Sequence, residues 1–151
     1  MKLAEALILR ADLDKSIEQL KNRVVSNSLV QEGTSPAEDP EELLKELHMK
    51  LNEYKELVIK INTTNLNAKT SEGLNLTSAI AERDRLQRLH GILSSVSNHA
   101  NSTTDRYSKK EILNISTVDV ASLRKQVDKV AERRRKIDVE IQAANWTSDL
   151  I

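Results

Sequence analysis

The sequence of 151 residues contains no cysteine and almost no aromatic side chains. Without cysteine the chain cannot form a disulfide, a thiolate metal site or a thiol nucleophile. Its only aromatic residues are two tyrosines and one tryptophan, too few for the stacking platform that binds single-stranded nucleic acid. Three glycines and two prolines interrupt the chain rarely, which favours long helices over an all-β fold with many turns.

An excess of one charge and a long hydrophobic run are also missing. Lys and Arg number 23 and Asp and Glu number 23, so no net charge attracts nucleic acid or anionic lipid. No stretch approaches the ~20 apolar residues that span a bilayer, so we expect no membrane insertion. Glu5 and Arg10 interrupt the first apolar segment, so we expect no secretory signal and a cytoplasmic location. The length fits a single helical domain over residues 1–151.

Four segments carry apolar residues at alternating steps of three and four, which predicts four long helices. We place them at about residues 3–25, 40–65, 77–101 and 117–146, with Asp39, Thr77 and Thr117 as N-caps and Pro40 in the first helical position. The connections 66–76 and 103–117 could form a short β arm or hairpin.

Each predicted helix has a seam, the line of side chains that repeats with the heptad. The four seams are Leu3, Ala6, Arg10, Leu13, Ile17, Leu20 and Val24; Leu44, Leu47, Leu51, Tyr54, Val58 and Ile61; Ala79, Glu82, Leu86, Leu89, Leu93, Val96 and Ala100; and Val120, Leu123, Val127, Val130, Arg134, Ile137, Ile141 and Ala144. With about two apolar positions per heptad, these seams are narrower than the stripe of a globular helix. We therefore predict an all-α fold, a coiled coil or helical bundle, that buries its seams by forming a homo-oligomer.

Charged residues occupy three of these seam positions: Arg10, Glu82 and Arg134. In a bundle that runs up, down, up and down, they would lie near one end, beside Asn62 and Asn65. Such a cluster could bind an anion, a phosphate or a nucleotide. We favour a second interpretation, in which the cluster is a buried polar network that sets register or oligomeric state. In a third, the seam drifts around the helix and leaves these groups exposed.

Familiar catalytic and metal-binding motifs are missing. Ferritin-like sites need a glutamate three residues before a histidine, and no pair of histidines has ligand spacing on one helix face. Lys45, Gln87 and Val96 stand three residues before His48, His90 and His99. No phosphate-binding glycine loop and no nucleophile elbow occurs, so we expect no cofactor and no metal, and favour a protein that is not an enzyme. The basic run 133–136 could contact phosphates, but consecutive residues spread around a helix, and we favour a solvated face.

Several strings together resemble a family of small bacterial proteins labelled septicolysin, over nearly the whole chain. They are residues 1–7 (MKLAEAL), 31–33 (QEG), 36–44 (PAEDPEELL), 61–65 (INTTN), 76–84 (LTSAIAERD), 105–108 (DRYS), 117–120 (TVDV) and 141–147 (IQAANWT). The resemblance implies no established biochemical activity. Its label suggests a cytolysin, but the chain has no apolar hairpin and no aromatic belt. The resemblance also implies polar motifs at Asn62, Asn65, Glu82, Arg83, Asp84, Arg106 and Tyr107.

The sequence thus predicts a homo-oligomeric helical protein without enzymatic activity. The alternative is a protein that binds a small molecule or anion, and could be an enzyme, through a polar cluster. We assign that cluster to Arg10, Asn62, Asn65, Glu82, Arg83, Arg106, Tyr107 and Arg134. A membrane-active cytolysin is the third interpretation, and nucleic-acid binding through residues 133–136 is the fourth.

Overall fold

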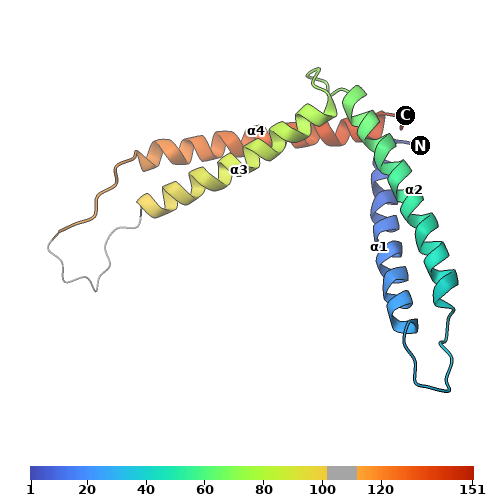
Figure 1. Cartoon of the computed structure of the whole chain (residues 1–151). Helices are drawn as coiled ribbons and strands as arrows, with labels where there is room; N and C mark the ends of the chain where they lie inside the picture. The colour runs from blue at the N-terminus through green and yellow to red at the C-terminus, as the bar shows by residue number, and fades with distance from the viewer. Residues whose placement is uncertain (102–111) are drawn as a thin grey trace. The chain divides into compact units, whose positions relative to one another are not determined.

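The computed structural model describes residues 1–101 and 112–151 of the chain. These residues form four helices, α1 (Leu3–Asn27), α2 (Pro40–Asn67), α3 (Leu76–Ala100) and α4 (Val120–Thr147), as Figure 1 shows. No β-strand occurs within these two ranges, so the all-α prediction is confirmed.

Neither connection contains a strand within the described residues, although Lys69 and Asn75 of the 66–76 connection are single bridge positions. Between α2 and α3 the chain makes a tight turn, in which the Thr70 N–H donates to the Leu74 carbonyl at 2.8 Å and the Gly73 N–H donates to the Thr70 carbonyl at 3.0 Å. Gly73 has a φ of 84°, a left-handed conformation that glycine adopts without strain. Of the 103–117 connection, residues 112–117 contain no strand, and the rest lies outside the described residues.

The chain divides into two compact units. The α1–α2 unit comprises residues 1–69 and 143–151, and the α3–α4 unit comprises residues 70–142. The end of α4, from Ala143, therefore belongs to the first unit. The single domain that we expect from the length stays a prediction.

In the α1–α2 unit, two antiparallel helices lie side by side along the predicted seam of α1 (Figure 1). Leu3, Ala6, Leu13 and Leu20 are all buried, while Ile17 is half-buried. The alternation of three and four residues keeps these side chains on one face of α1, and the prediction for this helix is confirmed.

The seam of α2 differs from the predicted one. Leu43 and Leu57 are buried, whereas Leu44 and Leu51, which the prediction placed in the seam, are exposed. A step pattern starting at Leu43 shares Leu47, Tyr54 and Ile61 with the predicted one, and it needs Lys50 in the seam. Lys50 is half-buried, which a long side chain tolerates because its aliphatic stem packs while its ammonium reaches Glu53 at 3.3 Å.

The start of α2 is as predicted. The Glu41 N–H donates to Asp39 Oδ1 at 3.0 Å, and Pro40 takes the first helical position. The caps predicted for the next two helices are wrong. Asn75 caps α3 by accepting from the Ser78 N–H at 2.8 Å, and Asp119 accepts from the Ser122 N–H at 3.0 Å at the start of α4. Asn and Asp cap at least as well as threonine, so Thr77 and Thr117 are passed over.

In the α3–α4 unit, α3 and the first part of α4 run side by side (Figure 1), and an ion pair of 3.6 Å joins Arg83 to Asp138. The buried side chains include those of Leu76, Ala79 and Leu86 on α3 and of Ile137 and Ile141 on α4. Ser97 rather than the predicted Val96 is buried near the end of α3.

Gly91 lies inside α3, where a Cβ atom would meet no neighbouring atom within 4 Å. We expect Gly91→Ala to raise the free energy of unfolding by roughly 0.5–1 kcal/mol, because glycine loses more backbone freedom in a helix than alanine does. Equilibrium urea unfolding measures this. Gly73→Ala is the matched contrast, since its φ of 84° makes alanine strained there. A destabilised Gly91→Ala variant would contradict the expectation.

Candidate functional site

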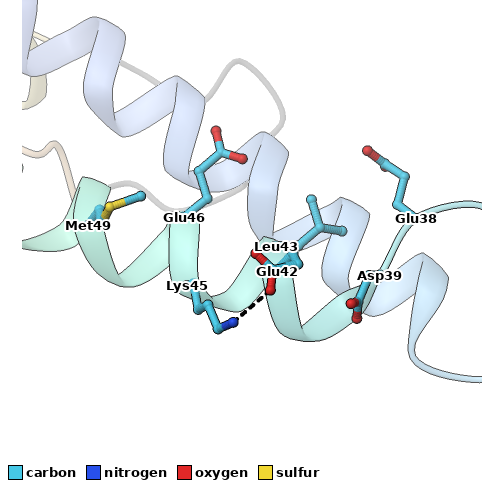
Figure 2. A pocket seen from close by; sticks show the side chains of 7 residues that line it. All are labelled: Glu38, Asp39, Glu42, Leu43, Lys45, Glu46 and Met49. Carbon is cyan, nitrogen blue, oxygen red and sulfur yellow. Dashed lines mark hydrogen bonds and ion pairs between the residues drawn. The ribbon is translucent and has the colours of Figure 1, made fainter.

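A groove of about 550 Å³ lies at the start of α2, shown in Figure 2. Its lining is Glu38, Asp39, Glu42, Leu43, Lys45, Glu46 and Met49. Lys45 donates to Glu42 at 2.6 Å, the contact drawn as a dashed line. Four carboxylates against one ammonium give the groove an acidic rim around two apolar side chains.

One of these carboxylates is held by α1. Arg23 donates to Glu38 through Nε at 3.0 Å and through Nη2. The Arg23 guanidinium lowers the pKa of Glu38 by this hydrogen bonding, and the Glu38 N–H donates to Asn27 Oδ1 at 3.0 Å. These contacts tie the connection between the helices to the end of α1.

The first and last residues of the chain pair in a short antiparallel contact, which we call the terminal bridge (residues 1–3 with 147–151). The Leu3 N–H donates to the Ser148 carbonyl at 3.0 Å, and the Leu150 N–H donates to the Met1 carbonyl at 2.9 Å. Lys2 forms an ion pair with Asp149 at 2.8 Å, and its hydrogen bond lowers the pKa of that carboxyl group.

The terminal bridge also reaches α2 through a buried threonine. The Ile151 N–H donates to Thr64 Oγ1 at 3.0 Å, and this hydroxyl donates to the Lys60 carbonyl at 2.9 Å. Thr64 therefore occupies the polar end of the α2 seam, where the sequence pointed to Asn62 and Asn65. Asn62 is exposed and Asn65 is half-buried. The seam pattern that begins at Leu43 ends at Thr64 and would have indicated this residue.

In the α3–α4 unit, the turn before α3 is tied to α4 by two acidic contacts. Ser71 donates to Glu140 through its backbone N–H at 2.9 Å and through its hydroxyl. Glu72 accepts from Arg133 at 3.2 and 3.3 Å. The charge of Arg133, the first residue of the basic run 133–136, is thereby neutralised by Glu72.

Glu82 and Arg83, two members of the predicted polar cluster, pair with residues outside that cluster. Glu82 is half-buried and pairs with Arg85 of its own helix at 2.7 Å. This hydrogen bond lowers the pKa of Glu82, and the charge of Arg133 adds to the effect. Arg83 pairs instead with Asp84 at 3.2 Å and Asp138 at 3.6 Å.

Arg134 is exposed on α4, so its predicted place in a buried seam is wrong. A long charged side chain leaves the interior readily when no buried carboxylate holds it. Arg10 is half-buried in the α1–α2 unit, and its meeting with Glu82 and Arg134 stays a prediction. Arg106 and Tyr107 lie outside the described residues.

Arg134 lines a groove of about 260 Å³ between α3 and α4, together with His90, Ala131, Arg135 and Asp138. No three or more His, Asp or Glu side chains gather at one metal-sized site within residues 1–101 and 112–151. No helix in these ranges is both long and apolar enough to cross a membrane.

Comparison with known proteins places the chain beside relatives without assigned activity. The sequence model described as a family of unknown function, DUF6847, matches residues 10–150. The crystal structure of a functionally unknown conserved protein from Corynebacterium diphtheriae is similar at 37% identity and a TM-score of 0.88, covering 100% of this chain and 99% of that one. The curated proteins contain no match. The resemblance to septicolysin stays a prediction.

Proposed function

Because the chain belongs to DUF6847, a family of unknown function, we propose its function from its surfaces: a non-enzymatic homo-oligomer in which α2 packs against a second copy. The observation that carries this proposal is an exposed apolar line on α2, formed by Leu44, Leu51 and Val58. We call it the α2 stripe.

The α2 stripe has the spacing of a coiled-coil position. Its three residues are seven apart, so they lie above one another along the helix. Leu44 is 41% exposed and Leu51 is 44% exposed, while Val58 is half-buried. The stripe lies one residue, ~100° around the helix, from the seam that begins at Leu43. The apolar surface of α2 is thus wider than the part its own unit covers.

Exposed leucines at heptad spacing are costly in water and are buried well by another helix. Along the outer edge of the stripe stand His48, Lys55 and Asn62, of which only Lys55 is a strong base. A chain with a formal net charge of zero does not repel its own copies. These features favour a second copy over a strongly acidic or basic partner.

The test compares two lysine substitutions on one helix. In Leu51→Lys the charge falls in the centre of the α2 stripe. In Met49→Lys it falls about 160° around the helix, where Met49 is 66% exposed. We expect the unchanged protein and Met49→Lys to have the same oligomeric mass in sedimentation experiments at micromolar concentration, and Leu51→Lys to have the mass of a monomer.

Circular dichroism checks that both variants keep their helix content. An unchanged protein that is monomeric at these concentrations would refute the proposal, as would a Leu51→Lys variant that keeps the oligomeric mass. Equal loss of mass in both variants would assign the effect to added charge and also refute it.

A further inference from the structure

The groove between α3 and α4 has the chemistry of an anion site. Two arginines and a histidine line it, against one acidic side chain, Asp138. We propose that this groove binds a phosphoryl group through Arg134, Arg135 and His90. The proposal rests on the α3–α4 unit alone and is independent of the oligomer proposed above.

The two arginines differ from their neighbours in having no ion-pair partner, although the carboxylate of Glu132 interacts electrostatically with Arg135. Within the basic run, Arg133 pairs with Glu72 at 3.2 Å and Lys136 pairs with Glu132 at 3.0 Å. Arg134 and Arg135 make no hydrogen bond or ion pair with any residue in the described ranges. Adjacent guanidinium groups repel each other, and a bound anion relieves this repulsion.

The acidic member of the groove is already engaged. Arg83 of α3 lies 3.6 Å from Asp138 and 3.2 Å from Asp84, so the positive charge of Arg83 offsets the carboxylate of Asp138 only in part. The groove thus presents two guanidinium groups against one partly offset carboxylate, with the His90 imidazole as a further N–H donor from the opposite helix. The sequence of residues 133–136 does not show which of the four basic side chains form ion pairs. Only the fold shows that Arg134 and Arg135 form none within the described residues.

The ligand class follows from the donors and the size. Guanidinium groups present paired N–H donors that match the oxygens of phosphate. The volume of about 260 Å³ lies just below the range of roughly 300–1,000 Å³ that is typical of small-molecule sites. The groove therefore fits one phosphoryl group better than an extended ligand. That group could be free phosphate or the head of a small phosphate ester.

Isothermal titration calorimetry on the full chain at low ionic strength measures the binding of inorganic phosphate, of glycerol phosphate and of chloride in separate titrations. We expect saturable binding of both phosphoryl ligands, with a dissociation constant on the order of 1 mM, and none of chloride. The double variant Arg134→Gln/Arg135→Gln should bind at least about 10-fold more weakly. The double variant Arg124→Gln/Lys125→Gln removes two exposed charges from the same helix outside the groove and should stay within about 2-fold.

Tighter binding of glycerol phosphate than of phosphate would support the proposal with an ester as the ligand, and equal binding would support it with the free ion. Absence of saturable phosphate binding overturns it. Equal weakening in the two double variants also overturns it, because this would show a general charge effect. Circular dichroism on both double variants separates lost binding from lost folding.

Discussion

Replacing Ile61 with alanine lowers the free energy of unfolding by about 2–5 kcal/mol. The Ile61 side chain is only 1% exposed, in the buried face of α2. Alanine removes apolar contacts there and leaves a cavity that the helix can fill only in part. Equilibrium urea unfolding followed by circular dichroism measures the change as a shift of the midpoint.

Ile59→Ala is the matched control, because Ile59 is the same residue type on the same helix but is 51% exposed. We expect its free energy of unfolding to change by less than about 0.5 kcal/mol. Similar losses in both variants would contradict the assignment of the seam, since they would mean that Ile59 is covered as completely as Ile61.

Thr64→Val lowers the free energy of unfolding by about 0.5–1.5 kcal/mol. Valine keeps the shape of threonine but cannot accept the hydrogen bond that the Ile151 N–H donates at 3.0 Å. Because Ile151 is itself 61% exposed, its N–H can turn to water, and the cost is that of one lost hydrogen bond. The terminal bridge should then open more often, which hydrogen exchange detects as faster exchange of the amides of residues 148–151.

Thr63→Val separates this effect from the loss of a hydroxyl in general. The neighbouring Thr63 is exposed and donates only to the Ile59 carbonyl of its own helix, at 3.0 Å. We expect a change within about 0.5 kcal/mol and unaltered exchange of residues 148–151. Unchanged stability and exchange in Thr64→Val would show that the bridge does not depend on this hydroxyl.

The seam of α1 and the start of α2 could be predicted because their signals are local. Leu13 and Leu20 lie seven residues apart with polar residues around them, so only one face of α1 can be apolar. Asp39 and Pro40 combine a strong cap with the ring that suits the first helical position. Neither signal depends on what packs against the helix.

The seam of α2 could not be predicted in the same way. Its apolar surface is wide, and the pattern starting at Leu44 contains no charged residue, whereas the one that the structure uses includes Lys50. The structure buries Leu43 and Leu57 and accepts Lys50 between them. A prediction from apolar content alone therefore selects the face that starts at Leu44 instead of the one that starts at Leu43. It does not take into account that the aliphatic stem of a lysine can pack in a seam.

The candidate site, too, could be predicted from the sequence only in part. The sequence singled out Arg134 as unusual, but for a charged cluster with Arg10 and Glu82 that stays a prediction. Only the fold places Arg134 beside Arg135 and opposite His90 in one groove. The corrected α2 seam reaches Thr64, but the bond from Ile151 could not be predicted, because Ile151 is 87 positions away along the chain.

The sequence alone determined the fold class, the number of helices and their approximate limits, since periodicity, caps and scarce glycine and proline act within a few residues. Tertiary structure decided which side of α2 is buried, how residues 1–3 pair with 147–151, and which arginines of the run 133–136 are neutralised. Those outcomes depend on groups distant in the chain, and short-range patterns carry no information about which distant groups will meet.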